Sequence, residues 1–209
     1  MKVWRRLLAA GALAAMLFTL PGCGGGDVPT SSSGSSGAAS SAAVPEPEPV
    51  VVEPAYYHPL TGVGMDEDLS RLRPVAVMIN DLKAAQPQLG VSQADIIYEM
   101  PAEGGITRMV ALFQSLDGVG NLGSIRSTRA YYLELALGHD ALLVHAGGSP
   151  EAYKDIPAWG VDNMDGVNGG SDAKIFWRDA ERRRTKGYEH SLLTSGEKIQ
   201  AYLDQGHFR

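Results

Sequence analysis

Hydrophobic residues form one long run near the start of the chain and several short runs in its later part. Residues 72–80 predict a buried strand entered through Pro74, because proline is tolerated where a strand begins. Residues 96–100 and 106–114 are also β-prone, and the five residues between them include two glycines, so they predict a β-hairpin. Residues 141–145 predict a further buried strand.

The sequence predicts helix starts at three places. Ser127 or Thr128 can cap the helix that follows them, since a short polar side chain accepts a hydrogen bond from the first turn. Ser149 fits an N-cap and Pro150 fits the first helical position. Residues 194–197 have the T-x-x-E pattern of a capping box, which predicts a last helix. The pattern as a whole predicts a mixed α/β (α+β) fold, in which a sheet with a β-hairpin is flanked by helices.

The long apolar run covers residues 7–20 and follows three basic residues, which is typical of a secretory signal. Its 14 residues are fewer than the roughly 20 that a membrane-spanning helix needs. The run leads into Gly22 and Cys23, a pair that resembles the lipobox of bacterial lipoproteins. Residues 1–23 are therefore expected to be a lipoprotein signal peptide, with an uncleaved anchor or a plain signal peptide as the alternatives.

The resemblance to a lipobox implies a lipid on Cys23, which is also the only cysteine, so no intramolecular disulfide can form. Two or three acyl chains would hold the protein stably, whereas a single chain binds only marginally. The expected location is the extracytoplasmic face of the cell membrane. Residues 24–55 consist mainly of Gly, Ser, Ala, Pro and Val, a composition that predicts a disordered tether ahead of a folded domain at residues 56–209.

Composition and charge narrow the possible partners of the folded domain. Hydrophobic residues make up 44% of the chain and charged residues 20%, which is ordinary for a globular protein. The net charge is −6, and without the three basic residues of the leader 15 basic residues remain against 24 acidic ones, a charge of −9. Nucleic acid is not an expected partner, because its binding depends on a basic surface.

No metal site or cofactor is expected from the sequence. The five histidines are scattered, and no two of them have the spacing of a ligand pair. Residues 162–172 are acidic and glycine-rich, but placing Gly166 at the turn position of a calcium loop puts Val161 where the first ligand belongs. The regular calcium loop is excluded, and an irregular oxygen site stays as an alternative.

Several long segments resemble the YerB-like bacterial lipoproteins, a family with a domain of unknown function. The segments are RPVAVMIN, SQADIIYEMPAEGGITRMVALFQ, GSIRSTRAYYLELA, LLVHAGGSPEAY, FWRD and HSLLTS. The resemblance implies a Gram-positive cell-envelope lipoprotein whose N-terminal domain is the present residues 56–209, truncated at Arg209 before a C-terminal domain. It implies no established reaction.

Two groups of residues are candidates for binding an anion. Gly147, Gly148 and Ser149 stand between a strand and a helix, where backbone N–H groups can converge on an anion. The alternative is that the two glycines only turn the chain.

The second group consists of Arg126 and Arg129, joined by Arg108. Guanidinium groups suit phosphate or carboxylate, and a spacing of three residues puts the first two on one helix face if the following helix reaches that far back. The alternative is that these arginines form structural ion pairs with acidic residues such as Glu99, Glu103 or Glu134.

These candidates lead to two functional hypotheses. The first is a non-catalytic module that binds an anionic envelope component or a membrane-protein partner. The second is an envelope enzyme, a glycan or phosphodiester hydrolase, in which Glu99 and Glu103 supply an acid and a base and His145 a further base. The second hypothesis requires all three groups to meet in one cleft.

Overall fold

The computed structural model describes residues 52–206 and residue 208. The expected signal peptide, Cys23 and nearly all of the expected tether lie outside these residues. The first strand that the structure describes begins at Tyr56.

The central layer is a five-stranded sheet with the order β4-β5-β3-β7-β8. Its strands are β3 (Val75–Asn80), β4 (Ile96–Pro101), β5 (Thr107–Phe113), β7 (Leu142–His145) and β8 (Asn163–Asp165). β4, β5 and β3 are antiparallel to one another, whereas β7 and β8 run parallel to β3. The predicted hairpin is confirmed as β4 and β5. All six residues of β3 are buried, which explains why its sequence is apolar without alternation.

A second sheet has the order β6-β10-β9 and is wholly antiparallel. It consists of β6 (Asn121–Gly123), β9 (Trp177–Arg178) and β10 (Leu192–Ser195). A small hairpin of β1 (Tyr56–Tyr57) and β2 (Gly64–Met65) precedes both sheets. The sequence analysis predicted none of these strands, because two to four residues are too few to show a period.

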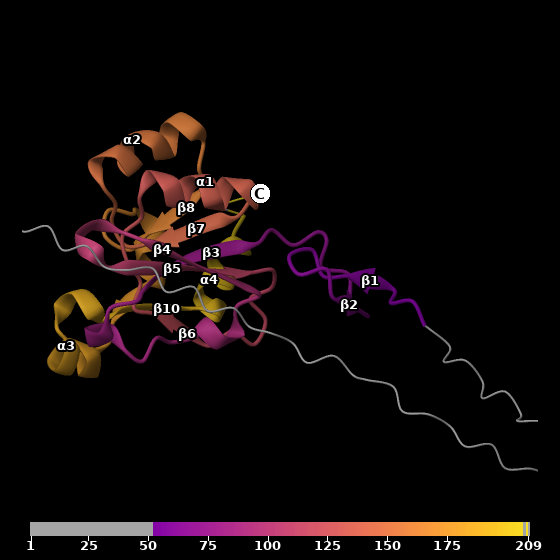
Figure 1. Ribbon diagram of the computed structural model, residues 1–209, viewed down its shortest axis with the longest axis horizontal. Helices are drawn as coiled ribbons and strands as arrows, with labels where there is room; N and C mark the ends of the chain where they lie inside the picture. The colour runs from indigo at the N-terminus through magenta and orange to yellow at the C-terminus, as the bar shows by residue number, and fades with distance from the viewer. Residues whose placement is uncertain (1–51, 207, 209) are drawn as a thin grey trace, which may run out of the picture. The chain divides into compact units, whose positions relative to one another are not determined.

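Helices α1 (Ala130–Gly138) and α2 (Pro150–Trp159) lie on one side of the central sheet, and α4 (Gly196–Leu203) lies with the second sheet on the other (Figure 1). Helix α3 (Ala180–Lys186) follows β9. Short 3-10 helices connect the elements: η1 (Lys83–Ala85), η2 (Val91–Gln93), η3 (Glu103–Gly105), η4 (Ser171–Ile175) and η5 (Tyr188–His190). The mixed α+β class expected from the sequence is thus confirmed.

The helix starts agree with the sequence at one place and differ at two. Ser149 caps α2 by accepting a hydrogen bond from the N–H of Ala152 at 3.1 Å, as predicted. Helix α1 begins only after Arg129 and has no side-chain cap, so the predicted caps at Ser127 or Thr128 are wrong. Helix α4 is capped by Ser195, whose hydroxyl accepts from the N–H of Lys198, and not by the first residue of the T-x-x-E pattern.

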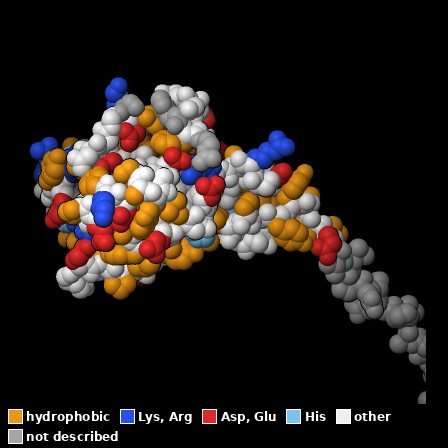
Figure 2. Space-filling model, turned by 90° about the horizontal axis from the view of Figure 1, so that it is seen from above, with side chains coloured by type: hydrophobic (Ala, Val, Ile, Leu, Met, Phe, Trp, Pro, Cys, Tyr) orange, Lys and Arg blue, Asp and Glu red, His pale blue; other side chains and the backbone are white. Residues whose placement is uncertain are grey.

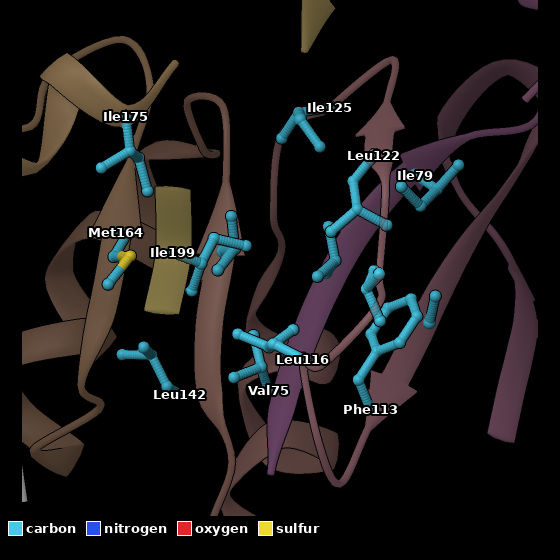
Figure 3. Packing of buried hydrophobic residues seen from close by; sticks show 14 of the residues in the cluster. Val75, Ile79, Phe113, Leu116, Leu122, Ile125, Leu142, Met164, Ile175 and Ile199 are labelled. Carbon is cyan, nitrogen blue, oxygen red and sulfur yellow. The ribbon is translucent and has the colours of Figure 1, made fainter. Parts of the chain in front are cut away.

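The two faces of the central sheet bury separate cores. Figure 3 shows the first, in which Val75, Ile79 and Phe113 from the sheet pack with Leu122 and Ile199 from the opposite layer. The second core joins the other face of the sheet to helices α1 and α2, and it includes Met78, Val110, Tyr132, Leu133 and Ala152. Alternate residues of β3 enter the two cores, as expected for a strand with both faces covered.

The surface of the domain is mixed in character. On the face that Figure 2 shows, acidic and basic side chains are interspersed among apolar ones. Tyr131 and Leu137 of α1 are among the exposed apolar side chains. None of the helices in the described part of the chain is both long and apolar enough to cross a membrane.

Candidate functional site: an arginine cluster

Residues 124–129, here called the arginine segment, join β6 to α1 and run in an extended conformation between three other parts of the chain. The N–H of Asn80 donates to the carbonyl of Ser124 at 2.9 Å, and the N–H of Arg126 donates to the carbonyl of Met78 at 3.0 Å. The N–H of Ile125 donates to the carbonyl of Leu192 at 2.8 Å. The segment therefore continues the ladder at the end of β3 while also holding the second sheet in place.

The end of the arginine segment lies beside the Gly147-Gly148 turn. The N–H of Thr128 donates to the carbonyl of Gly147 at 2.9 Å, and the N–H of Ala146 donates to the carbonyl of Arg126 at the same distance. The two groups of anion-binding candidates are thereby brought together. Arg126 and Arg129 do not share a helix face, because both precede the first residue of α1 and the helix does not reach back to them.

Arg108 stands on β5 with its side chain 6% exposed. Its Nη1 donates to the carbonyl of Ser127 at 2.9 Å, and its Nη2 lies 3.8 Å from a carboxylate oxygen of Glu103. Its buried Nε has no hydrogen-bond partner among the described residues. Burial lowers the pKa of Arg108, and the nearby positive charges of Arg129 and Arg126 lower it further. Buried charges with incomplete pairing cluster at functional sites, which makes Arg108 a candidate site residue.

Arg129 holds the carboxylate of Glu103 in a two-pronged ion pair. The Nε of Arg129 donates to one oxygen, and its Nη2 donates to the other at 2.8 Å. These hydrogen bonds lower the pKa of Glu103 to about 2. The carboxylate is thus ionised at neutral pH, and it cannot serve there as the proton donor that glycan hydrolysis needs.

Arg126 pairs with Glu189, an acidic residue that the sequence analysis did not select. Its Nη1 donates to the carboxylate of Glu189 at 3.1 Å, while its buried Nε has no hydrogen-bond partner in the described part of the chain. Arg178 of β9 lines the same small pocket as Arg126. The motif FWRD contains Arg178, but nothing in the sequence indicates that it meets residues more than 50 positions earlier.

The glycine turn does not offer free donors in the way that the sequence suggested. The N–H of Gly147 donates to the carboxylate of Asp165 at 2.8 Å, and the N–H of Ser149 donates to the carbonyl of Thr128 at 3.3 Å. The protein's own carboxylate thus takes the place expected for an external anion. Burial acts to raise the pKa of Asp165, but hydrogen bonds from Tyr153 and Gly147 bring it below its ordinary value.

The three groups proposed for catalysis are not gathered in one cleft. Glu99 is exposed on β4 opposite Met109, whereas Arg108 lies opposite the next residue and so faces the other side of the sheet. His145 is completely buried, with Nδ1 2.9 Å from the carbonyl of Gly147 and Nε2 3.0 Å from the side-chain oxygen of Asn163. The arrangement does not support the hydrolase hypothesis built on these residues.

The acidic loop around β8 is organised by hydrogen bonds within the protein. The carboxylate of Asp172 accepts from the N–H of Asp165 at 2.9 Å, and the hydroxyl of Tyr153 donates to the carboxylate of Asp165 at 2.6 Å. Within residues 52–206 and 208, no three His, Cys, Asp or Glu side chains are grouped so that they could hold a metal ion.

Fold and site together define an α+β domain with a cluster of partly buried arginines at the end of its central sheet. The chain belongs to the family described as "Protein of unknown function (DUF3048) N-terminal domain", whose model matches residues 60–209. This agrees with the YerB-like family expected from the sequence.

Two comparisons with individual proteins point the same way. The chain is 42% identical over 120 residues to "Putative lipoprotein YerB" of Bacillus subtilis (strain 168), an alignment that covers 57% of this chain and 35% of that protein. It is also similar to the crystal structure of the YerB protein from Bacillus subtilis, with a TM-score of 0.64 and 35% identity over 74% of this chain and 51% of the other. The chain therefore spans about half or less of the length of these relatives. The similarity supports the assignment of the chain as a lipoprotein of unknown function.

Proposed function

We propose that the domain is a non-catalytic binding module for an anionic component of the bacterial cell envelope, carried by a lipoprotein anchored at the extracytoplasmic face of the membrane. The observation that carries the proposal is the concentration of guanidinium groups at one place in an acidic protein. Among the described residues, Arg108, Arg126 and Arg129 are paired with only two carboxylates, those of Glu103 and Glu189.

The two carboxylates at the cluster are suited to being replaced by an external anion. Their side chains are 60% and 62% exposed, whereas those of the three arginines are between 6% and 17% exposed. The cations are therefore held by the fold, while their partners lie at the surface in the short 3-10 helices η3 and η5. An incoming carboxylate or phosphate meets preorganised guanidinium donors, and such charge-assisted hydrogen bonds are stronger than neutral ones.

The proposed location is supported by the first 23 residues together with the lipoprotein name of the relative. Cys23 would carry the lipid, and residues 24–55 would hold the domain away from the membrane surface. In that position the domain would be able to reach the anionic components of the cell envelope.

The anchor has a direct test. Cys23→Ala is expected to abolish incorporation of radiolabelled fatty acid into the protein and to release it from the membrane fraction after cell lysis. Wild-type protein labelled in parallel is the control. Fatty-acid labelling that persists in the variant would refute the assignment of Cys23.

Binding is tested with the full chain in mild detergent and fluorescently labelled cell-wall fragments. We expect saturable binding that weakens as salt is added, because exposed charge interactions are screened. The double variant Arg126→Gln, Arg129→Gln is expected to bind about tenfold or more weakly, as the loss of charge-assisted hydrogen bonds implies. Circular dichroism and thermal unfolding establish that the variant is folded.

Arg184→Gln is the control, since Arg184 is exposed on α3 and its one ion pair among the described residues is with Glu181 of the same helix. It removes one positive charge, against two in the double variant, from a different place. Its affinity should stay within about twofold of wild type, the scale of a surface ion pair. Equal losses in both variants would contradict a specific site. Release of soluble wall fragments would instead favour the enzyme hypothesis, and binding that requires added membrane protein would favour a protein partner.

A further inference from the structure

A pocket of about 180 Å³ lies between the arginine segment, β9 and η5. Two guanidinium groups line it, those of Arg126 and Arg178, and they come from parts of the chain that are 52 residues apart. Its remaining lining includes the exposed rim residues Tyr188 and Glu189 and several apolar side chains.

Arg178 is held in position, but no acidic side chain in the described part of the chain pairs with it. Its Nη1 donates to the carbonyl of Tyr188 at 2.6 Å and lies 3.5 Å from the hydroxyl of Ser191. Its guanidinium carbon lies 3.5 Å from the centre of the Tyr188 ring, a cation–π contact that fixes the plane of the group. Among the described residues it makes no ion pair with a carboxylate, so its charge is available to a ligand.

Glu189 carries the one negative charge among the residues that line the pocket, and Arg126 forms an ion pair with it. The carboxylate of Glu189 lies 3.1 Å from Nη1 of Arg126, and its other oxygen lies 3.6 Å from Nε2 of His190. Burial lowers the pKa of His190, so this histidine is neutral at pH 7. With two positive groups and one negative group, the pocket has an excess of one positive charge, which matches one monoanion.

The inner wall of the pocket is apolar. Ile125, Ala146 and Leu192 are buried there, and Val167 lies at the edge with more than half of its surface exposed. These side chains offer no hydrogen-bond donors. Ser127, the remaining residue of the lining, carries a hydroxyl. A phosphate, which is hydrophilic on all sides, would still lose solvation against the buried apolar side chains.

We propose that this pocket binds a carboxylate carried on a short aliphatic group, with the carboxylate between Arg126 and Arg178 and the aliphatic part against Ile125, Ala146 and Leu192. The inference rests on the proposed function and specifies which chemical group of the envelope component is recognised. Pockets for whole small molecules measure roughly 300–1,000 Å³, so one of about 180 Å³ holds only the end of a larger ligand. Two sources have this chemistry: the C-terminal alanine of a peptide and the lactyl ether of an acidic sugar.

Glu189 pairs with Nη1 of Arg126, a donor that the ligand's carboxylate would use in this arrangement. It is exposed, it belongs to the short helix η5, and it neutralises Arg126 in the absence of a ligand. Removing its charge should therefore strengthen binding, because the ligand no longer competes with it. A purely structural role for this ion pair gives no such gain.

The test is calorimetric titration of the full chain in detergent with four probes: N-acetyl-D-alanyl-D-alanine, N-acetylmuramic acid, N-acetyl-alanine amide and inorganic phosphate. We expect saturable binding of one or both carboxylates, which identifies the source, and none of the neutral amide. Arg178→Gln should weaken that binding about tenfold or more, as expected for a lost charge-assisted hydrogen bond. Glu189→Gln should strengthen it, and Arg184→Gln should leave it unchanged.

Binding of phosphate in preference to both carboxylates would overturn the inference, and so would affinities that are the same in Arg178→Gln and wild type. The two proposals fail separately. If wall binding depends on Arg126 and Arg129 but is unaffected by Arg178→Gln and is not competed by either carboxylate, the proposed function stands and this inference falls. If the carboxylates bind in an Arg178-dependent way but wall fragments do not bind, the inference stands and the proposed function falls.

Discussion

At the scale of single residues, Glu103 and Asp165 show two ways in which this domain keeps a carboxylate ionised. Glu103 is an exposed group whose charge is held by the guanidinium of Arg129, and this contact lowers its pKa to about 2. Asp165 is buried, and it is held by hydrogen bonds from Tyr153 and the N–H groups of Gly147 and Val167. An external anion can therefore replace the exposed carboxylate of Glu103, whereas the buried carboxylate of Asp165 is a fixed structural group.

The ion pair of Glu103 predicts a pH-dependent stability. Its folded-state pKa of about 2 lies below the ordinary value of 4.5, so the stabilisation is complete above about pH 5 and is lost as the pH falls towards 2. Because the carboxylate is exposed, Glu103→Gln should lower the free energy of unfolding at pH 7 by only about 0.5–1 kcal/mol. In urea titrations the difference between variant and wild type should shrink towards zero between pH 5 and pH 2.

The control for this prediction is Glu99→Gln. Glu99 is exposed on β4, and no ion pair involves it within the described residues. At pH 7 this variant should remain within about 0.5 kcal/mol of wild type, as is usual at surface positions. A stability difference for Glu103→Gln that is the same at every pH would show that the ion pair is not its cause.

The sequence identified Arg108, Arg126 and Arg129 as candidates by residue type and by the spacing of the last two, and the structure does bring them together. The sequence offered Glu103 as one possible partner, and this pairing is present. Glu189 and Arg178 could not be selected in the same way. Their closeness to Arg126 depends on how η5 and β9 lie against the arginine segment, and no local pattern reports such an approach.

At the scale of elements, the starts of α1, α2 and α4 were predicted to within two residues, whereas α3 was not predicted. Ser149 was identified as the cap of α2 because Pro150 follows it, and proline has one well-defined place at a helix start. The start of α4 was misplaced by one residue, because Thr194 and Ser195 are both suitable caps. Thr194 is instead the third residue of β10 and donates its hydroxyl to the carbonyl of Ile175, which leaves Ser195 to cap the helix.

The cap of α4 can be tested by mutation. Ser195→Ala removes the acceptor for the N–H of Lys198 and is expected to lower the free energy of unfolding by about 1 kcal/mol. Ser195→Asp keeps an acceptor and serves as the control, with a smaller loss. Chemical denaturation at pH 7 measures both, and equal losses in the two variants would contradict a capping role.

At the scale of the whole domain, one central sheet separates two cores, and the second sheet closes one of them. Leu122 of β6 is completely buried in the first core, where it packs in the same cluster as Val75 and Phe113 (Figure 3). The short strands of the second sheet contribute few hydrogen bonds to each other. The second sheet is held against the central sheet by apolar side chains of this kind, whose burial removes apolar surface of both layers from water.

Leu122→Ala is therefore expected to destabilise the domain by about 2–5 kcal/mol, the range for removing a large buried side chain. Leu137→Ala is the matched control, since Leu137 is 42% exposed on α1, and it should cost about 0.5 kcal/mol or less. Thermal unfolding followed by circular dichroism should show one transition in each variant. A cost for Leu122→Ala as small as the control's would contradict the role of the second sheet in the core.

The sequence alone determined β3, β7, the hairpin of β4 and β5, and the position of α2, because each is specified by residues that are close in the chain. Apolar runs, turn glycines and capping residues act through local backbone preferences and need no distant partner. Only the tertiary structure decided the second sheet and the arginine cluster. The pairs of Arg129 with Glu103 and of Arg126 with Glu189 join residues 26 and 63 positions apart. The crossing of the arginine segment between two sheets brings them together, because distant groups meet only where packing places their backbones side by side.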